Sequence, residues 1–434
     1  MVIAVSRGIE IRDPVHGYIE LSELEKRLID TEVFQRLRYI KQLALAYLVY
    51  PGAEHTRFGH SIGVMYLASI YGRHFMEEGV LDGDDVALLR VSALLHDIGH
   101  GPFSHLYEEL LIKYRGKTHE DIGSWIIEES EISDVLSEHG FDPKVVSKLA
   151  VGKYHVSDKG KLMSQIISGP VDADKMDFLL RDSYFTGVEY GRIDPHRLIS
   201  KSKYIDGVIA FRLPASLYAL EAFMIARYEM FRAVYFHKTV RAAELMLLRV
   251  LDGLKDELGI LDFRSVEEYC RLTDYTILAE LRRLVKTSQP RGEQRKILEL
   301  TSMLYRRDLF KCVFDKILHV STPQSIDLRV KVKDLEREIA SMVGIDDIYV
   351  IVDIVGIPSL PYTSYLPEPM DIPVYEYCDD GIKLGYLTQY STIAGVLRKF
   401  MNFIRVYTHR KFRNEVRKAA EKVLSEVISS LAFE

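Results

Sequence analysis

The segment from Val91 to His105, VSALLHDIGHGPFSH, constrains the fold more than any other part of the chain. Apolar residues at three- and four-residue spacing before it predict a helix that ends at Gly99. His96 and Asp97 point ~100° apart on a regular helix, so they share a ligand only where the helix unwinds. The segment therefore predicts one half of a metal site, followed by two further histidines, His100 and His105.

Composition narrows the class of protein. The chain has 434 residues, of which 47% are hydrophobic and 28% charged, which is enough to bury a large core and to form two lobes. Three separated cysteines, Cys270, Cys312 and Cys378, form neither a disulfide framework nor a zinc-finger spacing. No signal peptide or membrane span is evident, and the net charge of -6 gives no overall attraction for nucleic acid. We expect a soluble cytoplasmic protein.

Periodicity predicts a mostly α-helical protein with a smaller α+β C-terminal lobe. The predicted division places one domain at 1–320 and the lobe at 321–434. The first domain should hold a short strand or hairpin at 9–20 and helices at 23–29, 33–47, 55–76, from 169 onward and at 215–254. A helical pattern is also expected at 105–127, with an interruption near Gly116. Proline is expected in the first turn of the helix opened by Gly169-Pro170. The lobe should hold strands at 330–333 and 348–355, a hairpin at 373–387, and helices at 393–406 and 411–431.

A constellation of histidine and aspartate completes the metal site. His60, the pair His96-Asp97, and Asp174 follow one another along the chain. Two imidazoles and two carboxylates hold a borderline divalent ion and leave positions open for water and phosphate oxygen. The residues thus predict hydrolysis of a phosphate ester, with manganese, iron, magnesium, nickel and zinc all suitable metals.

Several long motifs carry a resemblance to a known family. They are DPVHGYIEL, DTEVFQRLRYIKQL, HTRFGHSIGV, HDIGHGPFSH, THED, DADKMDF and YRRDLFK, with a fainter FIRVYTHR near the C-terminus. With them the chain resembles the HD-domain phosphohydrolases and, more narrowly, the deoxynucleoside triphosphate (dNTP) triphosphohydrolases. The resemblance implies an HD-domain helical fold. It also implies attack of metal-activated water on the α-phosphorus, which releases deoxynucleoside and inorganic triphosphate.

The resemblance assigns roles on the phosphate side of the site. The metal ligands it implies are His60, His96, Asp97 and Asp174. It implies α-phosphate contacts from Arg57 and His100, and protonation of the departing 5′ oxygen by His105. The polar shell that orients histidines and water would comprise His119, Glu120 and Asp172. Cations for the β- and γ-phosphates would be Lys175 and Arg227.

The resemblance also assigns a sugar pocket. Its members would be Gln42, Leu43, Asp182 and Tyr235, with Tyr235 and Leu43 crowding the place of a 2′-hydroxyl. Phe178 also belongs to this substrate-binding set, but it stands where the family has a tyrosine, and Phe236 stands where a glutamine is expected. A preference for deoxyribose follows from the resemblance, while the preferred base stays open.

Regulation is the last implication of the resemblance. Vertebrate members hold a guanine nucleotide effector between subunits, and the matching positions here are Asp30, Gln35, Arg38 and Arg307. We therefore expect a homo-oligomer, a tetramer or dimer, that responds to GTP or dGTP. The same residues are also compatible with a capping aspartate and ordinary surface ion pairs.

Two other functions stay open on the residues alone. One is an HD phosphohydrolase that acts on nucleoside monophosphates or cyclic nucleotides, which would leave Lys175 and Arg227 without a phosphate partner. The other is a protein that binds nucleotides or single-stranded nucleic acid with little turnover, which the intact ligand set argues against.

Overall fold

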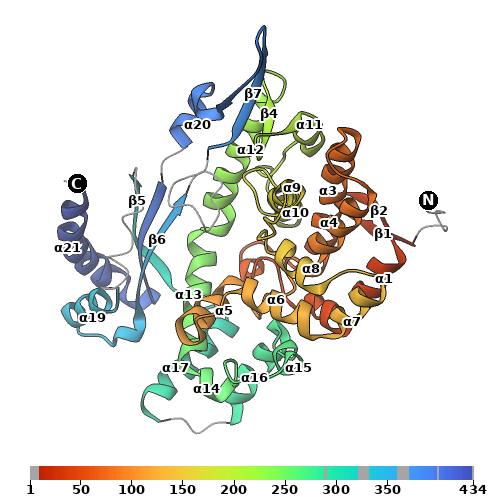
Figure 1. The fold of residues 1–434 in the computed structure, drawn as a ribbon. Coiled ribbons are helices and arrows are strands. Elements are labelled where there is room, and N and C mark those ends of the chain that lie inside the picture. The colour runs from red at the N-terminus through yellow and green to blue at the C-terminus, as the bar shows by residue number, and fades with distance from the viewer. Residues whose placement is uncertain (1–8, 288–290, 321–331, 359–370, 398–399, 433–434) are drawn as a thin grey trace.

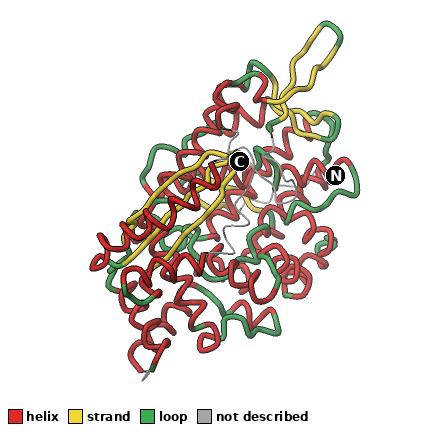
Figure 2. Tube along the Cα trace, turned by 90° about the vertical axis from the view of Figure 1, so that its left-hand side faces the viewer, coloured by secondary structure: helices red, strands yellow, loops and turns green. Residues whose placement is uncertain are grey.

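The computed structural model describes residues 9–287, 291–320, 332–358, 371–397 and 400–432, and the fold is mostly helical (Figure 1). Most strands gather in a sheet near the C-terminus and in a hairpin that projects from the body (Figure 2). No helix among the described residues is both long and apolar enough to cross a membrane. The predicted fold class, an HD-domain helical fold with a smaller α+β lobe, is confirmed.

The helices and strands have the following bounds. The helices up to residue 200 are α1 (Glu23–Ile29), α2 (Glu32–Gln35), α3 (Arg57–Glu77), α4 (Gly83–Leu95), α5 (His105–Arg115), α6 (His119–Glu129), α7 (Glu131–Glu138), α8 (Pro143–Ala150), α9 (Asp158–Ile167), α10 (Ala173–Thr186) and α11 (Pro195–Ser200). The later helices are α12 (Leu217–Met230), α13 (Lys238–Gly253), α14 (Lys255–Leu258), α15 (Val266–Cys270), α16 (Asp274–Thr287), α17 (Gly292–Tyr305), α19 (Val332–Val343), α20 (Thr392–Leu397) and α21 (Arg413–Ala432). The strands are β1 (Ile9–Asp13), β2 (Gly17–Leu21), β3 (Ser202–Ile205), β4 (Val208–Arg212), β5 (Lys311–Val320), β6 (Val350–Pro358), β7 (Pro373–Cys378), β8 (Gly381–Tyr386) and β9 (Phe400–Thr408).

Capping residues fix where the helices around the site begin. Asp82 caps α4 and Thr118 caps α6, each in a reciprocal capping box. Asp172 caps α10 and accepts from the backbone N–H of Lys175. Because α10 begins at Ala173, Pro170 lies before the helix and not in its first turn, where the sequence had placed it.

The predicted helix at 33–47 is wrong beyond Gln35. Helix α2 ends at Gln35, a 3₁₀ turn covers Arg36–Tyr39, and the chain then runs irregularly. The backbone N–H of Lys41 donates to the Asp274 carboxylate (2.9 Å), and that of Gln42 donates to the His55 carbonyl (3.0 Å). These two N–H groups therefore cannot form the hydrogen bonds of a helix. The segment is a loop instead, and it lines the cavity described below.

The predicted helix at 215–254 is interrupted where the site needs it. Helix α12 passes into a π-helical turn at Phe231–Tyr235. The helix is then interrupted at residues 236–237, and α13 begins at Lys238. His237 caps α13 with its ring Nδ1, which accepts from the N–H of Thr239 (3.2 Å). A π-helical turn of this kind re-aims side chains and is frequent at functional sites.

The C-terminal sheet has the order β5-β9-β6, with β9 antiparallel to both neighbours. The predicted helix at 393–406 is therefore wrong, because α20 stops at Leu397 and residues 400–408 form the central strand. One face packs Ile404 and Val406 against α19 and α21, and the other packs Phe403 against Phe236. Both faces of β9 are buried, so its apolar residues do not alternate with polar ones, and the pattern does not distinguish strand from helix.

The other predicted elements of this region have mixed outcomes. The hairpin at 373–387 is confirmed as β7 and β8, and β7 continues the sheet β3-β4-β7-β8 by a parallel pairing with β4. The strand at 348–355 is confirmed as β6, and the final helix as α21. The predicted strand at 330–333 is wrong in its second half, where α19 begins, and its first half lies outside the described residues. The division at residue 320 stays a prediction.

Candidate active site

The four predicted metal ligands converge from three helices. His60 lies in the first turn of α3, His96 and Asp97 follow the last turn of α4, and Asp174 lies in the first turn of α10. His60 Nε2 is 3.0 Å from Asp174 Oδ1 and 3.6 Å from Asp97 Oδ2. His96 Nε2 is 3.3 Å from Asp97 Oδ1 and 3.8 Å from Asp174 Oδ1. Two imidazole nitrogens and two carboxylates thus face a common point.

The outer nitrogen of each imidazole has a hydrogen-bond acceptor, as metal-binding histidines require. His60 Nδ1 is 2.8 Å from Asp177 Oδ2, and His96 Nδ1 is 2.8 Å from the Ala93 carbonyl. Both rings therefore present Nε2 to the cluster, and His96 Nε2 is buried without a hydrogen-bond partner in the described part of the chain. A buried, unpartnered imidazole nitrogen beside two carboxylates fits a divalent metal ion.

Asp177 contacts a candidate metal ligand, and the sequence analysis gave it no role. Besides His60 it accepts from His16 Nε2 (2.6 Å) and Arg181 Nε (2.8 Å), and Arg181 in turn contacts Asp13 (2.8 Å). Burial raises the pKa of Asp177, but Arg181 and the two histidines outweigh burial and hold this pKa well below its usual range. The motifs DPVHG and DADKMDFLLRD contain all of these residues except His60, so the signal was present.

In the absence of metal, the cluster holds a proton on His60. Burial lowers the pKa of His60, but hydrogen bonds with Asp174 and Asp177 outweigh it and raise this pKa to about 10. A metal ion at Nε2 would replace that proton, because the neutral imidazole is the ligand.

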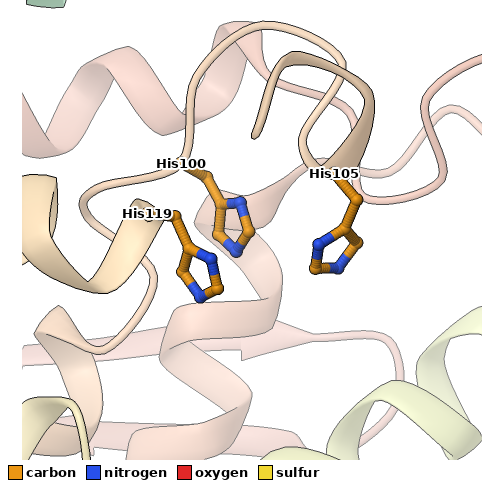
Figure 3. A group of neighbouring side chains, drawn as sticks. All are labelled: His100, His105 and His119. Carbon is orange, nitrogen blue, oxygen red and sulfur yellow. The ribbon is translucent and has the colours of Figure 1, made fainter. Parts of the chain in front are cut away.

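A second group of histidines lies beside the cluster (Figure 3). The rings of His100 and His119 are stacked, with centroids 4.0 Å apart and planes 14° apart, and the ring of His105 meets that of His100 edge-on at 5.2 Å. Stacked imidazoles direct their lone pairs side by side and not toward one point, so this trio is poorly suited to share a metal ion. Its nitrogens are better placed to contact anionic oxygen atoms.

Glu108, which the sequence analysis did not single out, orients two of these rings. Its carboxylate oxygens are 2.5 Å from His119 Nδ1 and 3.1 Å from His105 Nδ1. Burial lowers the pKa of His119, but the hydrogen bond and charge of Glu108 outweigh it and raise this pKa. The His105 side chain is 73% exposed, so it lies where a solvent-borne substrate can reach it.

Arg57 connects the His/Asp cluster to the turn before His105. Its Nη1 pairs with Asp97 Oδ2, and its Nε donates to Ser104 Oγ (2.7 Å). His100 Nε2 is 3.3 Å from Asp97 Oδ1 on the other side. Burial raises the pKa of Asp97, but the charge of Arg57 and the two neighbouring histidines hold it well below its usual range.

A cavity of about 580 Å³ opens from this cluster. Its wall includes most of the predicted catalytic and sugar residues: Gln42, Leu43, Arg57, His60, His96, Asp97, His100, His105, His119, Glu120, Asp174, Phe178, Asp182 and Tyr235. Among the residues of the predicted sugar pocket, Asp182 accepts from the Tyr235 hydroxyl (2.7 Å) and contacts His55 Nε2 (2.7 Å). The cavity also includes Arg241 and Glu244, which the sequence analysis did not single out.

Three predicted residues do not line this wall. Asp172 is fully buried and pairs with the Lys175 ammonium group (2.6 Å), so Lys175 is engaged within the protein. Arg227 stands over the ring of Phe231 at 5.3 Å, and Phe231 does line the cavity. The guanidinium Nε and Nη1 of Arg227 are buried and lack a hydrogen-bond partner among the residues described here. Burial lowers the pKa of Arg227 to about 10, so the group stays charged at neutral pH.

The predicted effector residues lie in two places. Asp30, Gln35 and Arg38 lie together. Gln35 donates to the carbonyl of Ile29, the residue before the C-cap residue Asp30 (2.8 Å), and accepts from Arg38 Nε (2.7 Å). Arg307 donates instead to the Leu48 carbonyl (2.8 Å).

Comparison with known proteins agrees with this geometry. Residues 57–169 match the HD domain, and residues 193–429, more than half of the chain, match the HD associated region. The uncharacterized protein MJ1154 of Methanocaldococcus jannaschii is 40% identical over 59% of this chain and 53% of its own length. A deoxynucleoside triphosphate triphosphohydrolase SAMHD1 homolog of Dictyostelium discoideum is 33% identical over 76% of this chain and 64% of its own length. The chain therefore spans about half to two thirds of the length of these relatives.

The fold is also that of a solved phosphohydrolase. The crystal structure of a phosphohydrolase from Bacteroides thetaiotaomicron matches 93% of this chain and 100% of its own, with a TM-score of 0.71 and 26% identity. This likeness covers the fold, and three of the four candidate ligands, His60, His96 and Asp97, lie in the region that matches the HD domain. The chain belongs to the family of HD-domain proteins that carry an HD associated region, and it has the fold of an HD-superfamily phosphohydrolase.

Proposed function

We propose that the protein hydrolyses deoxynucleoside triphosphates to deoxynucleoside and inorganic triphosphate. The observation that carries the proposal is the continuity of one cavity from the His/Asp cluster to the Tyr235–Asp182 wall. A cavity of about 580 Å³ is of the size that binds small ligands. The SAMHD1 homolog of Dictyostelium discoideum, which is named a deoxynucleoside triphosphate triphosphohydrolase, supports the same substrate class.

The metal ligands in this proposal are His60, His96, Asp97 and Asp174. A divalent ion held there supplies Lewis acidity and lowers the pKa of water. Asp177 keeps His60 in the tautomer that offers Nε2, and the Ala93 carbonyl does the same for His96.

The residues around the cluster handle the phosphate and the leaving group. Arg57 is positioned by Asp97 and Ser104 to donate to an α-phosphate oxygen, which neutralises developing charge. His105, oriented through Nδ1 by Glu108, carries the proton for the departing 5′ oxygen on Nε2. Within the described part of the chain, Arg227 Nε and Nη1 have no hydrogen-bond partner, and we assign this cation to the triphosphate tail. Arg227 would first have to move past Phe231, which lines the cavity. Lys175 would first have to leave Asp172.

Sugar selectivity rests on ring bulk in this proposal. Tyr235 and Leu43 line the cavity and crowd the position of a 2′-hydroxyl, and Asp182 fixes the Tyr235 ring. Phe178 meets Tyr235 edge-on at 6.0 Å and lends apolar contact but no hydroxyl.

The test is incubation of the purified protein with each dNTP and with several divalent ions, followed by chromatographic separation of the products. Deoxynucleoside and triphosphate are expected. Release of pyrophosphate or of orthophosphate from dNTPs would contradict the proposal. Turnover of nucleoside monophosphates or cyclic nucleotides alone would favour the other HD activity, in which Arg227 has no phosphate partner.

We also propose that a guanine nucleotide binds between subunits of a homo-oligomer. Asp30 is exposed at the end of α1, and Gln35 and Arg38 lie on the following turn. The carboxylate and amide suit the guanine edge, while Arg38 and Arg307 suit phosphate. Arg307 contacts a different loop, so in this proposal it would come from a neighbouring subunit.

A further inference from the structure

A buried carboxylate from the HD associated region ties together two loops of the candidate active site. Asp274 is the first residue of α16 and is 1% exposed. Its Oδ1 accepts from the backbone N–H of Phe103 (2.7 Å), and its Oδ2 accepts from the backbone N–H of Lys41 (2.9 Å). Phe103 belongs to the turn before His105, and Lys41 directly precedes Gln42 and Leu43 of the cavity wall. One side chain therefore holds two segments that are far apart in sequence.

The first of these segments is strained and needs such support. Phe103 has a φ of 59°, and Ser104 has a φ of 54° with a ψ of -115°. Residues with a Cβ rarely adopt these values, and they persist only where the surroundings over-determine them. The hydrogen bond from Phe103 to Asp274 fixes the first of the two strained residues at its backbone. Without it the backbone N–H of Phe103 loses its side-chain acceptor, and the strain favours relaxation of the turn toward ordinary torsions.

The strained turn carries groups that act on the substrate in the proposed function. His105 begins α5 immediately after Ser104. Ser104 Oγ accepts from Arg57 Nε (2.7 Å) and donates to the Lys41 carbonyl (3.3 Å). A relaxed turn would therefore shift both the proton donor and the arginine, while the metal ligands of α3, α4 and α10 stay in place.

Contacts from other side chains also hold the residues just before the turn. Tyr269 donates to the Gly99 carbonyl (2.7 Å), and Arg36 donates to the Ile98 carbonyl (3.1 Å). A side chain at position 99 would place Cβ 2.1 Å from the His119 carbonyl oxygen, which shows how closely this stretch is packed. The support for Phe103 comes from α16 instead.

We propose that Asp274 is a positioning residue of the active site. Its carboxylate locks the Phe103–Ser104 turn to the Lys41 loop, and through the turn it sets the positions of His105 and Arg57. The inference rests on the proposed function for its kinetic consequence, whereas the clamp itself is independent of the substrate.

The test compares D274N and D274A with the wild type. The asparagine keeps the size of the side chain but offers one acceptor oxygen in place of two, and the alanine offers none. We expect kcat for dNTP hydrolysis to fall roughly tenfold or more in D274A and by less in D274N, because small misplacements of reacting groups are costly. Metal content, measured by elemental analysis, should equal that of the wild type in both variants.

A control separates positioning from general destabilisation. Glu336 is also a buried carboxylate that accepts from a backbone N–H, that of Val352 (3.1 Å), but it lies in the C-terminal lobe away from the cavity. E336Q should lower the melting temperature without lowering kcat at a temperature well below it. An equal fractional loss of kcat in E336Q and D274N at matched stability would overturn the inference.

Amide hydrogen exchange tests the clamp without any turnover. Exchange in peptides that contain Lys41 and Phe103 should be faster in D274A than in the wild type, with D274N between them, and E336Q should leave it unchanged. Wild-type exchange and wild-type kcat in a folded D274A would overturn the inference. A wild type that hydrolyses no dNTP would contradict the proposed function alone, and the exchange data would then still decide whether the clamp exists.

Discussion

In each of the two histidines of the His/Asp cluster, Nδ1 is hydrogen-bonded within the protein and Nε2 faces the carboxylates. Asp177 fixes His60 and the Ala93 carbonyl fixes His96, so the two Nε2 atoms meet Asp97 and Asp174. Because these hydrogen bonds fix both rings on packed helices, the candidate metal site is preformed. Loss of one carboxylate should therefore remove metal without unfolding the chain.

We expect D174A to lose bound metal and dNTP hydrolysis while it keeps the melting profile of a folded protein. Asp174 is the carboxylate nearest to His60 Nε2, at 3.0 Å, and its loss leaves three ligands. Elemental analysis of the purified variant and a product assay measure the two effects. D256A, which alters an exposed aspartate, is the matched control and should behave as the wild type. Full metal content in D174A would refute the assignment of this ligand.

Glu244 should give the protein a pH-dependent stability. Burial raises the pKa of Glu244, Arg241 lowers it, and the result is a pKa of about 7 against 4.5 for an ordinary glutamate. Because the folded state binds this proton more tightly, its stabilising contribution is present below about pH 4.5 and is lost as the pH rises through about 7. The melting temperature of E244Q, which cannot ionise, should therefore exceed that of the wild type more at about pH 8 than at about pH 5.

Thermal unfolding at several pH values makes this comparison. E338Q, which changes an exposed glutamate on α19, should show the same difference from the wild type at every pH. A constant difference for E244Q as well would show that Glu244 titrates as it does in water.

The π-helical turn between α12 and α13 decides which side chains face the proposed sugar pocket. It places Tyr235 against Asp182 and stacks Phe236 on Phe403 of β9, with planes 8° apart. A continuous α-helix through Ala215 to Leu254 would rotate Tyr235 away from this position. The turn thus links the cavity wall to the C-terminal sheet, and Arg405 of β9 strengthens the link through the Phe236 carbonyl (2.6 Å).

Y235A and Y235F separate ring bulk from the hydroxyl hydrogen bond. Y235A should relax discrimination against ribonucleotides by about tenfold, since a pocket that merely crowds a hydroxyl discriminates through shape. Y235F keeps the ring and should keep the selectivity. The measurement is the ratio of kcat/KM for dGTP and GTP in each protein. Equal ratios in Y235A and the wild type would move the steric barrier elsewhere, with Phe178 the next residue to change.

The convergence of four candidate ligands and most helices could be predicted from the sequence, and particular residues show why other parts could not. His60, His96, Asp97 and Asp174 lie in long motifs with helix caps beside them, so local signals sufficed. Asp274 acts through two backbone donors supplied by segments 171 and 233 residues away, and no local pattern encodes that contact. The strand β9 was mistaken for helix because it is buried on both faces.

Assembly into an oligomer would give the exposed Asp30 group a function. In the proposed arrangement, Asp30, Gln35 and Arg38 of one subunit face Arg307 of another, with a guanine nucleotide between them. Binding at such an interface couples ligand and assembly reciprocally. The response of the whole molecule to GTP therefore tests these residues together.

We expect GTP or dGTP to increase the sedimentation coefficient and the rate of dATP hydrolysis of the wild type, and D30A to lose both responses. Asp30 makes its cap through backbone atoms, so alanine should leave α1 folded. E23A, on the exposed side of the same helix, should respond as the wild type. Identical behaviour of the wild type and D30A, with and without GTP, would mean that these residues have only a structural role.

The order of strands in the C-terminal sheet has a consequence for synthesis on the ribosome. β5 and β6 both pair with β9 and not with each other, although β9 is translated last of the three. A nascent chain that has not yet emerged to residue 408 therefore has two strands without their shared neighbour, and the wall at Phe236 lacks its support from Phe403 and Arg405. The pocket wall is completed only after β9 has emerged, so a chain truncated before residue 400 carries the four candidate metal ligands but lacks the strand that supports this wall.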